Sequence, residues 1–328
     1  MCRHLAYLGP PATLRSLLLD PPHSLSRQAW APRRQRHGTV NADGFGIGWY
    51  ADGDPVPARY RRDIPIWGDT SLPDLARVTS SRAVLAAVRS ATAGTASGEQ
   101  AAAPFADGRW LFSHNGRLDG WPESAARLAA GLLADQAGAA ALLSLEAMVD
   151  SAFLWALVAM RLRAGDAMDA ALAGTIAAAD AAGASGRFNF LLTDGHAIAA
   201  TACGDTLWYR RSAADPPGPD THAAAAALAS VTVASEPDDD EPGWTEVPDR
   251  HVLTATRSQV SVRPLGPAPW GGSASPSSLT ARDRSAPPAL PSSPSLPASP
   301  SLPASPDRPA AHRVPASTTT SASKGFET

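Results

Sequence analysis

The chain has 328 residues, a formal net charge of -3 and two cysteines, Cys2 and Cys203. This near-neutral balance gives no basic patch for nucleic acid, and two cysteines exclude a disulfide framework, as in a reducing compartment. No signal peptide is recognisable, and the most apolar helical stretch, residues 152–160, is too short to cross a bilayer. We therefore expect a cytoplasmic protein without a nucleic-acid or membrane partner.

The hydrophobic pattern predicts strands first, then helices, then strands again. Strands are predicted at 5–8, 45–50, 84–88 and 110–113, helices at 121–133, 146–163 and 166–182, and further strands at 188–193, 197–202, 206–209, 231–234, 251–254 and 259–262. Pro122 lies near the start of the first helix, where proline is tolerated, and Asp166 is predicted to cap the third. This order favours an α+β fold of antiparallel sheet flanked by helices over an alternating βαβ array.

The composition changes near Pro264. Beyond it the chain is rich in Pro, Ser and Ala, and the hexamer Ser-Leu-Pro-Ala-Ser-Pro occurs at 295–300 and again at 301–306. Such a segment buries too little apolar surface to offset its ordering entropy, so we expect a folded domain over 2–264 and a disordered tail over 265–328. A second Pro-rich stretch, 212–225, is predicted to be a surface loop.

Cys2 directly follows the initiator Met1, and a cysteine is small enough for that methionine to be removed. The mature chain would then carry a thiol nucleophile and a free α-amine base on one residue. The alternative is a frayed chain end at which the cysteine has no role.

One glycine-rich segment lies within a predicted strand. Gly44, Gly46 and Gly48 alternate along a predicted strand, which weakens it unless another group approaches its backbone closely. The alternative is a glycine-rich hairpin edge.

Asn115 and Gly116 follow the strand at 110–113, where an Asn-Gly pair is typical of a hairpin turn but could also form an oxyanion hole. The neighbouring His114 is a possible general base, although a lone histidine is more often structural.

Two charged residues lie in otherwise apolar surroundings. Arg89 ends the strand at 84–88, and its planar guanidinium matches a carboxylate bidentately, with an internal ion pair as the alternative. Asp150 lies in an apolar helical run over 147–160, where it either faces water or pairs with a cation. Together with Cys2 and the Asn115-Gly116 pair, these residues would suit a γ-glutamyl group. The arginine would hold its α-carboxylate, the aspartate its α-ammonium, and the thiol would attack its side-chain amide.

With these motifs, the chain resembles the class II glutamine amidotransferase domains of the N-terminal-nucleophile hydrolase superfamily. The resemblance rests on Cys2, Asn41-Ala42-Asp43-Gly44, Arg89-Ser90-Ala91-Thr92, His114-Asn115-Gly116 and Asp150-Ser151, in that order, and extends over about 2–263.

More narrowly, the chain is similar to the γ-glutamyl amidohydrolases of ergothioneine biosynthesis. The segments that support this similarity are 2–9, 85–92, 108–116 and 234–237. Many members of the broad family carry a histidine two residues before this arginine. At that position, two residues before Arg89, this chain has Ala87. This difference weakens the case for ordinary glutaminase specificity.

The resemblance implies a four-layer αββα fold and hydrolysis of γ-glutamyl-hercynylcysteine S-oxide to glutamate and hercynylcysteine S-oxide, without a metal or organic cofactor. It also implies the functional residues, which are Cys2, Asn115 and Gly116 for catalysis and Arg89, Asp150, Thr92 and Asp43 for substrate binding. The leaving group carries a trimethylammonium and an imidazole, which favour aromatic faces or carboxylates. Tyr7, Trp49 and Trp67 are further candidates for lining that pocket.

Two alternatives remain at this stage. One is a glutaminase that supplies ammonia to a separate synthase, although the chain contains no synthase domain. The other is a non-enzymatic interaction protein that retains Met1 and docks partners through its Pro-rich tail. The oligomeric state does not follow from the sequence.

Overall fold

The computed structural model describes residues 2–38, 40–91, 95–132, 136–212 and 229–266. A seven-stranded antiparallel sheet has the order β11-β9-β10-β1-β4-β2-β3, which places β1 between β10 and β4. Its strands are β1 (Arg3–Thr13), β2 (Phe45–Trp49), β3 (Ala58–Arg62), β4 (Ser80–Val88), β9 (Trp208–Ser212), β10 (Ser230–Ala234) and β11 (Thr245–Glu246).

A six-stranded antiparallel sheet has the order β13-β12-β8-β7-β6-β5. Its strands are β5 (Phe105–Asp107), β6 (Trp110–Leu118), β7 (Gly186–Thr193), β8 (Ile198–Ala202), β12 (His251–Ala255) and β13 (Val260–Pro264). The two sheets pack face to face, because alternate residues of both, such as Ala6, Leu85, Leu111 and Leu191, share one buried apolar cluster.

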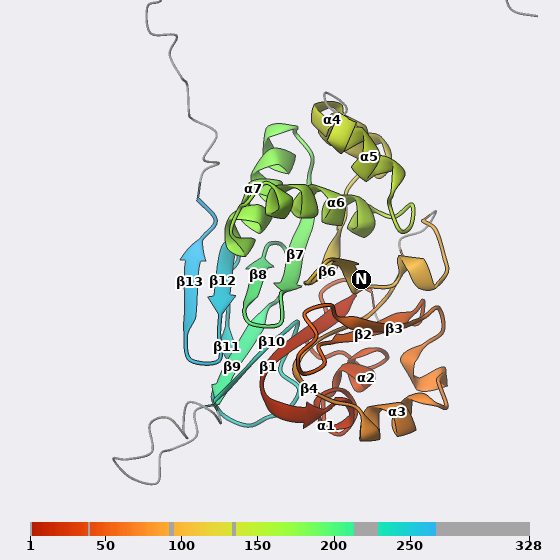
Figure 1. Ribbon diagram of the computed structural model, residues 1–328, viewed down its shortest axis with the longest axis vertical. Coiled ribbons are helices and arrows are strands. Elements are labelled where there is room, and N and C mark those ends of the chain that lie inside the picture. The colour runs from red at the N-terminus through yellow and green to blue at the C-terminus, as the bar shows by residue number, and fades with distance from the viewer. Residues whose placement is uncertain (1, 39, 92–94, 133–135, 213–228, 267–328) are drawn as a thin grey trace, which may run out of the picture. The chain divides into compact units, whose positions relative to one another are not determined.

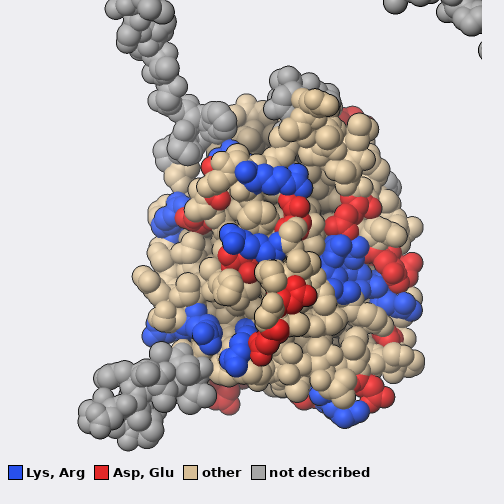
Figure 2. All heavy atoms as spheres, viewed as in Figure 1, with Lys and Arg blue, Asp and Glu red and all other residues tan. Residues whose placement is uncertain are grey.

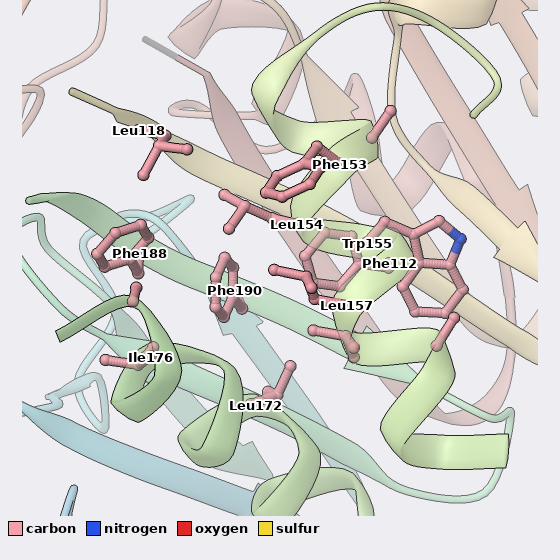
Figure 3. Close-up of a cluster of buried hydrophobic side chains, with 14 of the residues drawn as sticks. Phe112, Leu118, Phe153, Leu154, Trp155, Leu157, Leu172, Ile176, Phe188 and Phe190 are labelled. Atoms are coloured by element: carbon pink, nitrogen blue, oxygen red, sulfur yellow. The ribbon is translucent and has the colours of Figure 1, made fainter. Parts of the chain in front are cut away.

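Helices cover the outer face of each sheet, which completes four layers in the order αββα (Figure 1). On the six-stranded sheet, Phe112, Phe190, Trp155 and Leu172 form the centre of a second cluster (Figure 3). A third cluster lies between the seven-stranded sheet and the short N-terminal helices. The helices are α1 (Leu14–Leu18), α2 (Leu25–Gln28), α3 (Leu72–Val78), α4 (Glu123–Leu132), α5 (Gln136–Leu143), α6 (Asp150–Arg163) and α7 (Met168–Ala181), with 3-10 turns at Ile66–Gly68 and Glu99–Ala101.

The α+β class and the αββα layers are confirmed, and every predicted strand and helix overlaps an observed element. Several local predictions were wrong. Asn115 and Gly116 do not form a turn, because β6 continues to Leu118. Asp166 does not cap α7, because that helix begins after Ala167 without a side-chain cap. The carboxylate of Asp166 instead forms an ion pair with Arg161 at 2.7 Å.

The predicted disordered tail at 265–328 lies outside the described residues except for its first two positions, and most of the predicted loop at 212–225 also lies outside them. Within the described ranges, no helix is long and apolar enough to span a membrane. On the face shown in Figure 2, acidic and basic side chains lie next to one another rather than in blocks of one sign. Ion pairs such as Arg59–Glu146 at 2.9 Å join side chains of opposite charge in the described residues.

Candidate active site

Cys2 lies immediately before β1, at the end of the seven-stranded sheet where β4 also ends. Arg3 pairs with Val88 across the ladder, so Cys2 and Arg89 are neighbours just beyond the paired residues. Cys2 is partly exposed and opens onto a pocket between the two sheets and the start of α6. The pocket is lined by Cys2, Ala87, Val88, Arg89, Ser90, Ala91, Thr95, Ala101, Ala103, Phe105, His114, Gly116, Val149, Asp150 and Ser151.

Arg89 is buried, with 8% of its surface exposed. Its backbone is fixed by two hydrogen bonds, because its N–H donates to the carbonyl of Gly44 at 2.8 Å and its own carbonyl accepts from Asp43 at 2.9 Å. Its guanidinium donates to the carbonyl oxygens of Asp43 (3.2 Å) and Ala96 (2.8 Å). No carboxylate among the described residues forms an ion pair with this guanidinium, so its positive charge is available to an anion in the pocket.

Asp150 is the first residue of α6 and is 6% exposed. Its Oδ2 accepts a hydrogen bond from the Leu118 N–H at 2.9 Å, and its Oδ1 accepts from the Ser151 N–H at 2.8 Å. The sequence placed this aspartate in the interior of a helix, which was wrong, since the helix begins at it. A carboxylate at a helix N-terminus is stabilised by the helix dipole. Over the described ranges it has no ion-pair partner, which leaves its charge available to a cation.

His114 is buried and both of its ring nitrogens have partners. Nε2 lies 2.8 Å from the carbonyl oxygen of Arg187 and must donate to it, so in the neutral ring Nδ1 accepts from the Ser151 hydroxyl at 3.0 Å. Burial lowers the pKa of His114, although the nearby Asp150 carboxylate acts in the opposite direction. This satisfied, neutral ring has the structural role that is usual for a lone histidine, and it links the strand of Gly116 to the start of α6.

Asn115 is fully buried and is not among the residues that line the pocket, whereas its neighbour Gly116 is. Its Nδ2 lies 3.5 Å from the hydroxyl of Ser235, and its Oδ1 has no hydrogen-bond partner within the described part of the chain. Ser235 also accepts a hydrogen bond from the His4 N–H at 3.0 Å. The amide of Asn115 therefore lies beside the first residues of β1, and its hydrogen-bonding capacity is largely unused.

The other residues predicted for the site are Asp43, Thr92 and three aromatic residues. Asp43 is exposed and does not line the pocket; its Oδ2 accepts a 2.7 Å hydrogen bond from the Ala91 N–H and so holds the loop that follows Arg89. Thr92 lies outside the described residues, whereas Thr95 lines the pocket. The three aromatic candidates for binding the leaving group do not line the pocket of Cys2. Tyr7 and Trp49 pack in the cluster under the N-terminal helices, and Trp67 is exposed.

The glycines of β2 are required by a close approach, as their alternation predicted. A Cβ on Gly46 would collide with the carbonyl oxygen of Ala103, and a Cβ on Gly48 with the side chain of Leu111. Ala103 and Phe105 line the pocket, so β2 packs directly behind its wall. Sequence reasoning missed Phe105, because β5 has three residues and no detectable period.

Two face-to-face antiparallel sheets between helical layers, with a cysteine at the start of a central strand, define a fold of the N-terminal-nucleophile hydrolase type. The family model of class-II glutamine amidotransferases matches residues 17–229. The chain belongs to this family.

Two curated relatives are similar over most of the chain, and both are named γ-glutamyl-hercynylcysteine sulfoxide hydrolase. The protein of Mycolicibacterium smegmatis is 43% identical over 265 residues, which cover 81% of this chain and 100% of the relative. That of Mycobacterium tuberculosis is 41% identical and covers 81% and 97%.

Solved structures agree on the fold. A class-II domain protein from Silicibacter pomeroyi has a TM-score of 0.54 at 25% identity and covers 81% of this chain and 100% of its own. The phosphoribosylpyrophosphate amidotransferase of B. subtilis, at 15% identity, has a TM-score of 0.53 and covers 81% of this chain and 49% of its own.

Proposed function

We propose that this protein hydrolyses the γ-glutamyl amide of γ-glutamyl-hercynylcysteine S-oxide, releasing glutamate and hercynylcysteine S-oxide. The observation that carries the proposal is the convergence of three groups on one pocket: Cys2, a buried arginine and a buried aspartate. The names of the M. smegmatis and M. tuberculosis relatives, at 43% and 41% identity, support this choice of substrate.

The γ-glutamyl group would bind with its α-carboxylate on Arg89 and its α-ammonium near Asp150. Each buried charge would thereby gain an ion-pair partner, which neither has among the described residues. Since both residues are anchored by backbone hydrogen bonds, the glutamyl group would be held in one orientation, with its γ-carbonyl towards Cys2. Asp43 would support this subsite through its hydrogen bond to Ala91, and Thr92, three residues after Arg89 in the sequence, would contact the glutamyl group.

The reaction would require removal of Met1, which leaves the α-amine of Cys2 free to act as the base. The α-amine takes the proton of the thiol, and the resulting thiolate attacks the γ-carbonyl. The N–H of Gly116, which lines the pocket, would stabilise the oxyanion together with the side-chain amide of the neighbouring Asn115. Collapse breaks the C–N bond, and the protonated α-amine gives its proton to the leaving amine. Water then attacks the γ-glutamyl thioester and loses a proton to the α-amine, releasing glutamate and restoring the thiol.

The test is release of glutamate from γ-glutamyl-hercynylcysteine S-oxide compared with release from glutamine. We expect efficient release from the first substrate, much slower release from glutamine, and none from either substrate with Cys2→Ala. Equal release by Cys2→Ala would refute the role of the thiol. A preference for glutamine, stimulated by an added synthase, would instead support an ammonia-supplying glutaminase.

A further inference from the structure

A fully buried ion pair lies directly behind the nucleophile. The Nη2 of Arg3 donates to Oδ2 of Asp205 at 3.1 Å, and both side chains are 0% exposed. The Nε of the same guanidinium donates to the backbone carbonyl of Cys2 at 3.1 Å. One side chain therefore connects the residue that carries the nucleophile to the loop after β8 in the opposite sheet.

Asp205 is itself rigidly held. Its backbone N–H donates to Oδ1 of Asn189 at 3.1 Å, and its carbonyl accepts from Nδ2 of Asn189 at 2.9 Å. Its Oδ1 accepts from the N–H of Thr206 at 2.8 Å, so Oδ2 is the oxygen left for the arginine. The carboxylate is thus a fixed point against which the guanidinium can be oriented.

The ladder of β1 explains why this support is needed. Pairing with β10 begins only at Leu5, opposite Ala234, and the Ser235 N–H bonds the carbonyl of His4. Cys2 therefore extends beyond β10, and the guanidinium of Arg3 supplies the hydrogen bond that its carbonyl does not receive from that strand. A lysine could not bond Cys2 and Asp205 in the same way, because it lacks the planar fork of donors.

Stability alone is a weak explanation for the pair. Burial lowers the pKa of Arg3, and the neighbouring Asp205 and Glu236 only offset that effect. Buried ion pairs contribute little net stability compared with apolar residues of similar volume. The second acid, Glu236, is already used by the backbone N–H groups of Arg33 and Arg34, at 2.9 and 2.6 Å.

We propose that Arg3, oriented by Asp205, is a positioning residue that fixes the carbonyl of Cys2 and thereby the direction of its α-amine and thiol. This inference rests on the proposed hydrolase function. A nucleophile and a base on the same residue depend on one backbone orientation, so a small rotation would misplace both. The glutamyl subsite at Arg89 and Asp150 is built by other contacts and would stay intact.

The experiment compares Arg3→Lys and Asp205→Asn with wild type, using γ-glutamyl-hercynylcysteine S-oxide and counting Met1-free chains by intact mass. We expect kcat to fall about tenfold to hundredfold while KM changes less than about threefold, because misplacement affects the chemical step and not glutamyl binding. Iodoacetamide labelling of Cys2, mapped by mass spectrometry, should remain stoichiometric in both variants. The matched control is Arg210→Lys, since Arg210 also bonds a carboxylate, that of Asp239 at 2.7 Å, and should keep wild-type kcat.

Wild-type kcat in both variants would overturn the inference, and so would a rise in KM with unchanged kcat. If Arg3→Lys does not melt cooperatively, Asp205→Asn decides, because it preserves the volume of the side chain. Failure of the wild type to release glutamate would refute the proposed function instead, so the two failures are distinguishable.

Discussion

At the scale of single residues, the site is defined by two buried charges that have no ion-pair partner among the described residues. Arg89 and Asp150 are both less than a tenth exposed, and neither has an opposite charge within ion-pair distance in the described ranges. Each residue was ambiguous in the sequence, because an arginine after a strand or an aspartate in an apolar run can equally form an internal pair. The fold resolves the ambiguity by placing both on one pocket with Cys2.

Arg89→Lys should raise KM for the γ-glutamyl substrate about tenfold or more, because a bidentate contact to the α-carboxylate becomes a single one. Steady-state kinetics measure this change, with kcat falling less than KM rises. Arg82→Lys is the matched control, since Arg82 lies in β4, the strand that Arg89 follows, but is exposed and pairs with Asp52 at 3.5 Å. An unchanged KM in Arg89→Lys would remove the arginine from the binding site.

At the scale of elements, the apolar strands and the longer helices were predictable because each contains a long run of apolar residues. Several of the elements that were missed contain no such run. β3 has the sequence Ala-Arg-Tyr-Arg-Arg and is stabilised by distant acids, as in the Arg59–Glu146 and Arg62–Glu99 pairs. The helices α1 and α2 have only five and four residues. Their formation depends on tertiary packing, which a local pattern does not contain.

Gly46→Ala should destabilise the protein and lower activity together. The added methyl would collide with the Ala103 carbonyl, so β2 must move away from the wall of the pocket. We expect the free energy of unfolding to fall by about 1–3 kcal/mol, as for other overpacked sites. Urea denaturation with parallel activity measurements tests this expectation, with Gly68→Ala as the control, because a Cβ there meets only Pro65 at 3.9 Å. Equal stability of the two variants would contradict the close approach.

At the scale of the whole molecule, buried histidines link stability to pH. Burial is the main cause that lowers the pKa of His4 to about 3, followed by the charge of Arg3. The unfolded chain, with a histidine pKa of about 6.5, therefore takes up protons that the folded chain does not. The contribution of the neutral His4 ring to the free energy of unfolding is fully present above a pH of about 6.5, and it should be lost progressively as the pH falls towards about 3.

The contribution of His4 can be isolated by His4→Gln. Between about pH 6 and pH 4, the free energy of unfolding of this variant should depend on pH less steeply than that of the wild type, by about 1.4 kcal/mol per pH unit. Urea denaturation at several pH values measures the slope. His196→Gln removes an exposed ring and is the control. Identical slopes for wild type and His4→Gln would contradict the buried neutral state of His4.

Also at this scale, the tail should be dispensable for catalysis. The M. smegmatis relative aligns over its full length with 265 residues of this chain, and the described part of the catalytic domain ends at residue 266. Deletion of residues 267–328 should therefore leave kcat and KM within about twofold of wild type, because no site residue is removed. A large loss of activity in the shortened protein would show that the tail contributes to the site.

The proposed mechanism requires that Cys2, freed of Met1, forms a thioester with the γ-glutamyl group. The most direct measurement is rapid acid quenching of wild type mixed with γ-glutamyl-hercynylcysteine S-oxide, followed by intact-mass and peptide analysis. We predict a chain without Met1 whose mass is increased by one glutamyl group, located on Cys2 and absent in Cys2→Ala. A glutamyl group on another residue, or full activity of a chain that retains Met1, would contradict the claim.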